Sequence, residues 1–305
     1  MTLLPVDWVV AFYNVTLIGV WLPRAGESAV ARWMIAVHAA GLGLLWLLAR
    51  GPSLEWRLTR ALREVYPILW LLVFWRELGL HCGLVGSAPN DAYVARLDQA
   101  LFGANWSAVW APAMPTGWLS ELMQGVYFAY YVACPLVLLH LLLARGRDTA
   151  RETTLRMVLV YTGAYLVYAI APTVGPMAMA EFPRFAGPAA SGLFRRLNDW
   201  LQATGDAAGT AFPSTHVAGA VTLAWLAWRH YSQRLAWLLS ALALLIAPAT
   251  VYTQNHFLLD AVGGALLAWW CQSWLVPFLT RSPAERRWPA LGFGTRLRET
   301  EAEAA

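Results

Sequence analysis

Charged residues are scarce in this chain, at 13% of the sequence against about 25% in typical soluble domains. Hydrophobic residues make up 59% of the 305 positions. This composition excludes an ordinary soluble fold and predicts an all-α, polytopic helical membrane protein. Lysine is absent, so all 22 basic residues are arginine, a usage that we interpret as that of a GC-rich bacterial genome. The arginines lie between apolar stretches, so no nucleic-acid partner is expected.

Cysteine is also rare. The three cysteines, Cys82, Cys134 and Cys271, are scattered, and the last two lie in apolar runs. They match neither a disulfide framework nor a zinc-binding spacing. The sequence therefore implies no metal ion and no other cofactor. The N-terminus lacks the basic start of a signal peptide, so we expect the first apolar stretch to remain as a helix.

Uncharged intervals locate the predicted membrane spans, because a helix needs about 20 apolar residues to cross the hydrocarbon. Together with a span at about 65–84 that Arg76 and Glu77 interrupt, they predict eight helices. The intervals run over 7–24, 32–50, 121–145, 156–181, 206–229, 234–260 and 260–281. No internal repeat is evident.

Arginine clusters fall on alternate connections of this eight-helix arrangement, and cytoplasmic loops retain positive charge. The clusters are Arg50, Arg57, Arg60 and Arg63; Arg145, Arg147, Arg151 and Arg156; Arg229 and Arg234; and Arg281, Arg286 and Arg287. The pattern predicts that both termini are cytoplasmic, in a bacterial inner membrane. Segments 85–121, 173–214 and 252–256 are then extracytoplasmic, and any active site would lie there.

Three parts of the chain can be distinguished. Residues 1–64 are expected to form two N-terminal transmembrane helices and a cytoplasmic loop, and residues 65–276 a six-helix core. Segment 85–121 of this core carries Trp106, Trp110 and Trp118 and is predicted to form one or two helices along the outer interface. Ordinary membrane-belt positions explain these tryptophans better than substrate contacts do. Residues 277–305 are predicted to be a disordered cytoplasmic tail.

Two histidines stand forty positions apart, His216 after Pro213-Ser214-Thr215 and His256 four residues before Asp260. Forty residues correspond to one helix across the membrane and one helix back, so both histidines are expected at the same face. Ser214 or Thr215 can cap a helix whose first-turn N–H groups attract phosphate oxygens. Pro-Ser-Thr is also simply a good helix start.

Asp260 can hydrogen-bond the imidazole of His256, fix its tautomer and leave the other ring nitrogen free to react. A lone His-x3-Asp pair is as often structural as functional. Two such motifs at one depth of the membrane point to a catalytic site.

Pro213-Ser214-Thr215-His216 and His256-x3-Asp260 resemble the second and third signature motifs of the type 2 phosphatidic acid phosphatase superfamily. The resemblance implies that His256 is the nucleophile, Asp260 orients it and His216 is the general acid. It also implies the superfamily's six-helix core, formed here by the third to eighth helices, behind two extra N-terminal helices.

Three further stretches resemble landmarks of the inositol phosphorylceramide synthase branch in the same order, and the resemblance as a whole, with the histidine motifs, covers about two thirds of the chain. They are Leu97-Asp98-Gln99-Ala100-Leu101-Phe102-Gly103, Gln124-Gly125-Val126-Tyr127-Phe128-Ala129-Tyr130-Tyr131 with Pro135, and Pro172-Thr173-Val174-Gly175-Pro176.

The sequence departs from the phosphatase pattern where that pattern has positive charges. Where the pattern has a lysine, this sequence has Ala164-Tyr165, and where the pattern has an Arg-Pro pair, it has Ala171-Pro172. Thr250 stands in the place of an arginine that precedes the nucleophile in the pattern. Fewer cations favour a phosphodiester over a dianionic phosphomonoester. Arg76, Arg195 and Arg196 are candidate replacements. Alternatives are an ion pair of Arg76 with Glu77 and attraction of the other two to anionic lipid.

The favoured hypothesis is a lipid phosphotransferase that moves a phosphorylated headgroup from a phospholipid to a lipid hydroxyl acceptor through a phosphohistidine. With water as acceptor, the same machinery is a lipid phosphatase. An ion- or proton-coupled transporter would need ionisable groups throughout the membrane depth and a repeat, and a lipid-binding scaffold would not need both histidines and Asp260. Gly263 and Gly264 are interpreted as positions of close helix packing. The sequence does not specify the oligomeric state.

Overall fold

The computed structural model describes residues 3–50, 57–84, 90–114, 116–180, 182–183, 185 and 187–281. These residues form helices without a β-strand, apart from an isolated bridge between Thr173 and Thr210. Of the predicted disordered tail, 282–305 lie outside the described residues. Residues 85–89 of the predicted interfacial segment also lie outside them.

Eight long helical stretches confirm the eight-helix expectation within the described residues. Six of them are long and apolar enough to cross a membrane, whereas α9 has 16 residues and α3 carries more charge. The eighth stretch runs from α11 into α12 through a π-helical turn, Cys271–Leu275. The stretches are α1 (Pro5–Trp21), α2 (Ala29–Arg50), α3 (Arg57–Leu84), α6 (Gly117–Ala144), α7 (Arg147–Ile170), α9 (Thr215–His230), α10 (Gln233–Tyr252), and α11 (Leu258–Trp270) with α12 (Val276–Thr280).

The helix ends differ from the uncharged intervals at two places. Helix α7 ends at Ile170, well before residue 181, and α9 begins only at Thr215. Pro172 and Pro176 follow α7, and Gly175 adopts a φ of 101°, which a helix cannot contain. The uncharged intervals therefore included stretches that are not helical and that fold against the end of the bundle.

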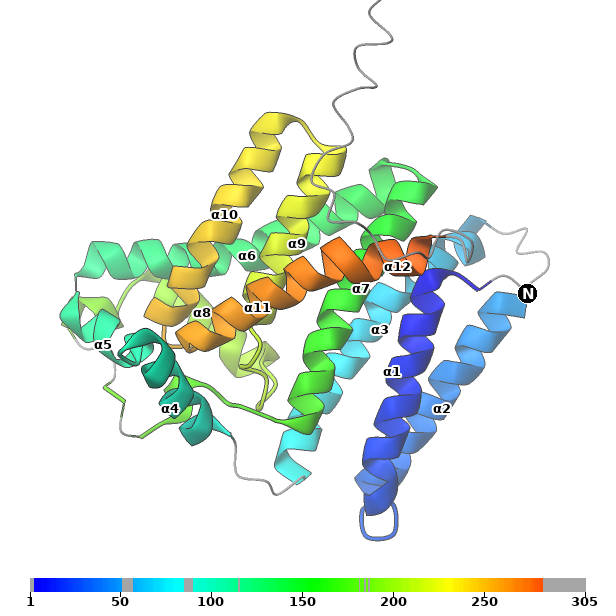
Figure 1. The fold of residues 1–305 in the computed structure, drawn as a ribbon, viewed down its shortest axis with the longest axis horizontal. Coiled ribbons are helices and arrows are strands. Elements are labelled where there is room, and N and C mark those ends of the chain that lie inside the picture. The colour runs from blue at the N-terminus through cyan, green and yellow to red at the C-terminus, as the bar shows by residue number, and fades with distance from the viewer. Residues whose placement is uncertain are drawn as a thin grey trace, which may run out of the picture.

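Helix α7 is the centre of the bundle. Its apolar span is 72% buried, against at most 39% for the other five candidate spans. Helices α1, α3, α6 and α9 all pack on it, and α9 in turn packs on α10 and α11 (Figure 1). One hydrophobic cluster contains residues of α1 together with residues of α3 and α7, so the N-terminal pair shares its core with the rest of the bundle.

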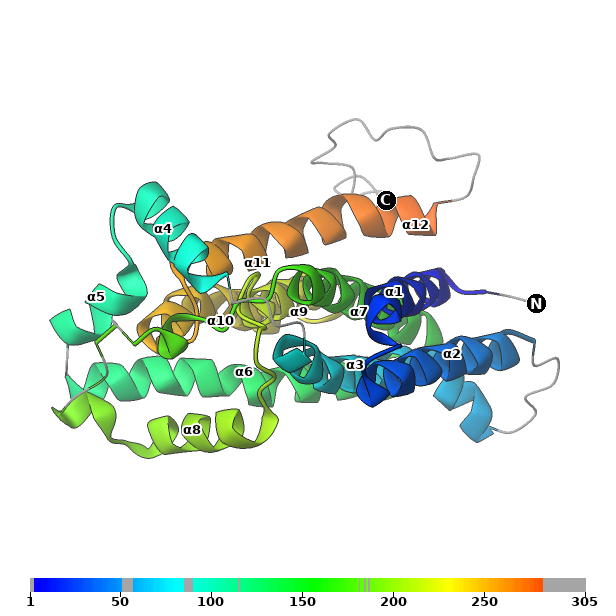
Figure 2. The same ribbon diagram turned by 90° about the horizontal axis from the view of Figure 1, so that it is seen from below.

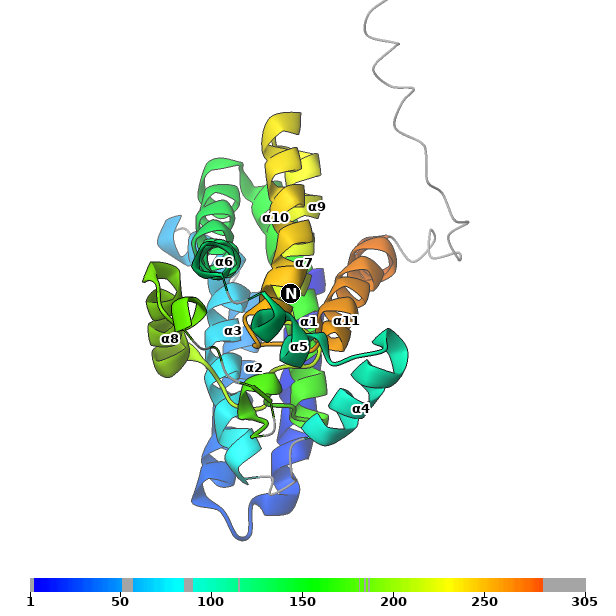
Figure 3. The same ribbon diagram turned by 90° about the vertical axis from the view of Figure 1, so that its left-hand side faces the viewer.

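Shorter helices surround one end of this bundle. Segment 85–121 contains the two predicted helices, α4 (Asp91–Phe102) and α5 (Trp106–Ala113). The next connection adds two single turns, Pro176–Ala178 and Gly187–Ala190, and the helix α8 (Leu193–Gly205), which was not predicted. Figures 2 and 3 show α4 and α8 on opposite sides of the bundle, with α8 alongside α6.

A buried polar network attaches α1 and α2 to α3. Glu77 of α3 accepts a hydrogen bond from Trp21 Nε1, and its Oε1 lies 2.8 Å from His38 Nε2. The other ring nitrogen of His38 lies 2.9 Å from Asn14 Oδ1. Glu77 is 2% exposed, whereas the neighbouring Arg76 is exposed. The predicted ion pair between Arg76 and Glu77 is therefore replaced by a contact between Glu77 and His38.

We expect Glu77→Ala to lower the free energy of unfolding by on the order of 2 kcal/mol or more, because it leaves two buried donors without an acceptor. Thermal unfolding of the purified protein in detergent measures this loss. Arg76→Ala is the matched control, with a change within about 0.5 kcal/mol. Equal stability of the two variants would contradict a structural role for Glu77.

Candidate active site

His216 lies in the first turn of α9. Ser214 precedes this helix as its N-cap, and its Oγ accepts a hydrogen bond from the backbone N–H of Val217 at 3.4 Å. The structure thus confirms Ser214 as the capping residue, and Thr215 is the first helical residue. Both side chains are buried. The start of α9 presents N–H groups and the positive end of its dipole near the His216 ring.

His256 lies in the short connection between α10 and α11. Two residues earlier, Gln254 has a φ of 63°, the left-handed region that residues other than glycine seldom adopt. Its side-chain amide donates to the carbonyl oxygens of Ser107 and Pro183, at 3.0 and 2.8 Å. This strained residue is therefore held from two sides, and the backbone leading into His256 is fixed.

The α9–α10 hairpin brings the two histidines into contact. His216 Nδ1 lies 3.5 Å from His256 Nε2, and the ring centroids are 5.6 Å apart. On the other side of the His256 ring, Nδ1 lies 3.4 Å from Asp260 Oδ2. This separation is long for a hydrogen bond, as is common in ligand-free active sites. The three residues form a continuous series, with Nε2 of His256 facing His216.

Asp260 belongs to the first turn of α11, whereas His256 precedes that helix. The two residues therefore do not share a helix face, although a spacing of four positions would place them on one face of a continuous helix. Asp260 Oδ2 instead accepts the backbone N–H of Phe257 at 2.8 Å. The carboxylate caps α11 and contacts His256 at the same time, so the orientation of its oxygen is fixed by the helix start.

The first turns of α9 and α11 are joined through their backbones. Ser214 N–H donates to the carbonyl oxygen of Asp260 at 2.9 Å. A methyl group added at Gly264 would overlap the carbonyl oxygen of Ser214, and one at Gly263 would come within 2.8 Å of the Phe212 ring. The expectation of close helix packing at these two glycines is confirmed.

Tyrosines of α6 surround His216. Tyr131 Oη lies 3.0 Å from His216 Nε2, and the rings of Tyr127 and Tyr130 lie 4.7 and 5.1 Å from the imidazole. With Tyr131 at Nε2, the remaining nitrogen, Nδ1, faces His256. Sequence reasoning quoted these tyrosines as a landmark but assigned them no role. The one signal in the sequence was the spacing of the three tyrosines by about one helical turn, which places them on the same face of a helix.

Two buried carboxylates of α4 hold the segments around the site. Asp91 accepts the N–H groups of Val174 and Gly175, at 3.1 and 2.7 Å, and Asp98 accepts the N–H of Leu259 at 2.7 Å. Seven residues separate them, so they share one face of α4. Burial raises the pKa of Asp98 to about 6, and the nearby Asp260 adds to this effect. Sequence reasoning missed Asp91 and quoted Asp98 only as part of a landmark stretch, without a role.

A cavity of about 430 Å³ opens beside His216, between α3 and α6, with α7 as its floor. Its far part is apolar, and its polar end contains His216, Tyr131 and Asp206. Desolvation raises the pKa of Asp206 to about 6, and the nearby His256 lowers it. The other lining residues are Ile68, Leu71, Leu72, Trp75, Tyr130, Leu138, Met157, Tyr161, Tyr165, Leu201, Thr204, Gly205 and Thr215.

The structure brings together His216, His256, Asp260, Ser214 and Thr215, but it places the candidate arginines elsewhere. Arg76 and Arg196 are exposed and do not line the cavity. Arg195 forms an ion pair with Asp199 at 2.9 Å and lies over the Phe185 ring. In the described part of the chain, the lining residues of this cavity include no arginine.

A half-buried histidine, a buried histidine and a buried carboxylate meet at the end of a membrane bundle, beside a largely apolar cavity, which is an arrangement that can perform acid–base and nucleophilic catalysis on a lipid. The family comparison agrees with this interpretation. A family model described as the PAP2 superfamily matches residues 92–274, and the chain belongs to that superfamily. Comparison with curated proteins and with solved structures gave no match. Members of this superfamily are phosphatases or phosphotransferases.

We expect Gly264→Ala to lower phospholipid turnover by about a hundredfold, because the methyl group separates the two helix starts and misplaces Asp260 by a fraction of an ångström or more. Turnover is measured as release of labelled headgroup in detergent micelles. Gly43→Ala is the matched control, since a methyl group at that helical position contacts nothing within 4 Å. Equal activity of both variants would show that the helix contact is dispensable.

The raised pKa of Asp98 predicts a pH dependence of stability. Because the pKa in the folded protein is above the ordinary value of 3.8, folding favours the protonated carboxyl. Its contribution is fully present below about pH 4 and is lost as pH rises through 6, by on the order of 3 kcal/mol.

Chemical unfolding between pH 4 and 8 measures this contribution. Asp98→Asn is expected to flatten the curve, whereas Gln99→Ala, at the adjacent exposed position, leaves it unchanged. Superimposable curves for the wild type and Asp98→Asn would contradict the assignment.

Proposed function

We propose that the protein is a lipid phosphotransferase, similar to inositol phosphorylceramide synthases, which transfers a phosphorylated headgroup between lipids at the extracytoplasmic face. The observation that carries the proposal is the contact of His256 Nε2 with His216 Nδ1 beside a largely apolar cavity. Such a cavity suits the hydrocarbon part of a lipid, while His216 lies at its polar end and contacts His256. Membership of the superfamily supports action on a lipid phosphoester.

The proposed reaction has two halves. In the first, the lone pair of His256 Nε2 forms a bond to phosphorus as the bond from phosphorus to the lipid alkoxide breaks, and His216 Nδ1 gives its proton to the departing oxygen. In the second, His216 accepts the proton of an acceptor hydroxyl whose oxygen attacks phosphorus, and the bond to His256 breaks. Asp260 orients His256 and stabilises its positive charge.

The charge of the site favours a phosphodiester as the donor. A phosphomonoester carries up to two negative charges at neutral pH and depends on fixed cations, which the lining residues of the cavity lack in the described part of the chain. A phosphodiester carries one charge, which the start of α9 and the histidine pair can accommodate. Asp206 at the polar end adds negative charge and disfavours a dianion further.

Covalent labelling tests the mechanism. With a phospholipid that carries labelled phosphorus, we expect acid-labile label on the wild type and none on His256→Ala. Asp260→Asn should reduce it strongly. His216→Ala should slow turnover by 10²–10⁴-fold, the usual contribution of a general acid.

His140→Ala is the control, because this exposed histidine of α6 contacts Tyr231 away from the site. Full turnover by His256→Ala would eliminate the proposed nucleophile.

Product analysis distinguishes transfer from hydrolysis. Purified protein is incubated with phosphatidylinositol, phosphatidylglycerol or phosphatidic acid, each with ceramide, with diacylglycerol or with no acceptor, and the products are identified by mass spectrometry. Transfer predicts a new phosphodiester lipid only when acceptor and diester donor are both present. Release of water-soluble phosphate from phosphatidic acid at a higher rate would instead identify a lipid phosphatase.

A further inference from the structure

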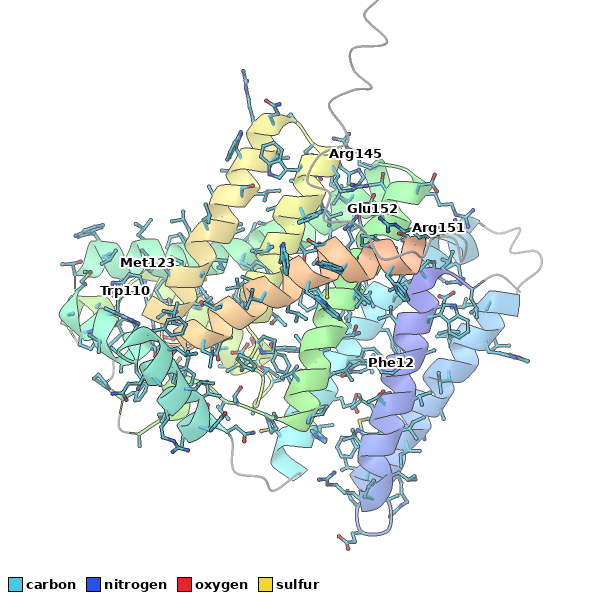
Figure 4. The ribbon with its side chains drawn as sticks, in the orientation of Figure 1. Phe12, Trp110, Met123, Arg145, Arg151 and Glu152 are labelled. Atoms are coloured by element: carbon cyan, nitrogen blue, oxygen red, sulfur yellow. The ribbon has the colours of Figure 1, made fainter. Side chains whose placement is uncertain are left out.

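A second cavity, of about 320 Å³, lies at the opposite end of the bundle from the histidines. Arg229 of α9 lines it, thirteen residues after His216, which corresponds to about 20 Å along the helix. Arg151 and Arg156 of α7 also line it. Figure 4 shows Arg151 and Glu152 at this end of the bundle, with Trp110 and Met123 at the other end.

The arginines of this cavity exceed the carboxylates that pair with them. Glu152 binds Arg156 at 2.8 Å and Arg229 at 2.6 Å, and Glu64 binds Arg151 at 2.8 Å and also Arg147. In this network of described residues, four arginines share two carboxylates. Arg147 is exposed and lies outside the cavity, so the three arginines that line the cavity pair with two carboxylates, and the excess of one positive charge favours binding of an anion there.

Of the three arginines that line the cavity, Arg156 is buried, Arg151 is half-buried and Arg229 is exposed. Arg156 is 6% exposed and donates from Nη1 to Gln272 Oε1 at 2.7 Å. The start of α1, at Leu4, Pro5 and Val6, forms another wall of the cavity. Asp7 in the first turn of this helix accepts the backbone N–H of Leu4 and pairs with Arg63, so the helix start forms a wall of the cavity and adds no free charge to it.

The remaining lining is apolar. Leu155 and Val276 complete the walls together with the side chains of the α1 start, and Thr280 of α12 closes one side. A fixed guanidinium group can bind two phosphate oxygens at once. A ligand that carries phosphate next to hydrocarbon matches both parts of this lining, whereas free phosphate matches only the arginines.

We propose that this cavity binds the headgroup of an anionic phospholipid, at the membrane face opposite the histidine pair. The phosphate lies among Arg151, Arg156 and Arg229, and the glycerol and first acyl carbons contact Leu155 and Val276. The bound lipid joins α1, α7, α9 and α12, four helices that end at this face. This site is separate from the catalytic one and does not depend on the proposed reaction.

Native mass spectrometry of the delipidated protein in detergent tests the proposal, with dioleoyl-phosphatidylglycerol and dioleoyl-phosphatidylcholine as probes. We expect the wild type to bind phosphatidylglycerol at least tenfold more tightly than phosphatidylcholine. Arg151→Gln/Arg229→Gln should lower the affinity for phosphatidylglycerol at least tenfold, because each charged hydrogen bond to phosphate contributes about that factor or more. Its affinity for phosphatidylcholine should not change.

Arg145→Gln is the matched control. Arg145 lies at the same end of the bundle but over the Tyr231 ring, outside the cavity (Figure 4), so its removal should leave the preference intact. Arg229→Lys keeps the positive charge but cannot bind two phosphate oxygens at once, so we expect a severalfold loss of affinity for phosphatidylglycerol. This single variant tests the site even if the double variant does not fold. Because the double variant retains the histidine cavity, binding there does not account for the loss.

Three results would overturn the proposal. The first is equal affinity of the wild type for the two lipids, and the second is an equal loss of affinity in Arg145→Gln and in the cavity variants. The third is displacement of phosphatidylglycerol by millimolar inorganic phosphate, which would identify a site for the free anion rather than for a lipid.

Discussion

The contact between the first turns of α9 and α11 is the constraint on which the site depends. Ser214 N–H donates to the Asp260 carbonyl oxygen, and Gly264 allows the Ser214 carbonyl to approach α11 without a side chain between them. His216 follows Ser214 by two residues, and His256 precedes Asp260 by four residues, so the two helix starts position both imidazoles. Ser214 caps α9 and Asp260 caps α11, so each motif fixes its own local backbone. The backbone contact between the two helix starts then fixes the position of each motif relative to the other.

Supports from outside the two motifs complete this arrangement. Asp98 binds the backbone of Leu259 next to Asp260, and Asp91 of the same helix binds the segment after α7. Tyr131 Oη lies within hydrogen-bond distance of Nε2 of His216, and the side-chain hydrogen bond of Gln254 holds the strained backbone before His256. Helix α4 therefore connects the segment after α7 to the start of α11 across the end of the bundle. Precise placement of reacting groups requires such second contacts.

Charge is separated along the bundle. Among the described residues, the charged side chains that line the cavity beside His216 comprise one carboxylate and no arginine, while those that line the cavity at the opposite end comprise three arginines and one carboxylate. A lipid phosphate at the histidine end therefore depends on helix N–H groups and on the imidazoles. At the arginine end it depends on guanidinium groups. The two environments match the two proposals, catalysis at one end of the bundle and binding of an anionic lipid at the other.

The sequence by itself determined the helical membrane class, the number of long helices and the pairing of the two histidine motifs, because hydrophobic length and motif spacing are local properties of the chain. It also indicated Ser214 as a cap and the glycines as packing positions. Only the tertiary structure decided that Asp91, Asp98 and Tyr131 support the site, that Arg76 and Arg196 lie outside it, and that Glu77 pairs with His38. Those outcomes depend on which distant segments meet, and neither composition nor spacing contains that information.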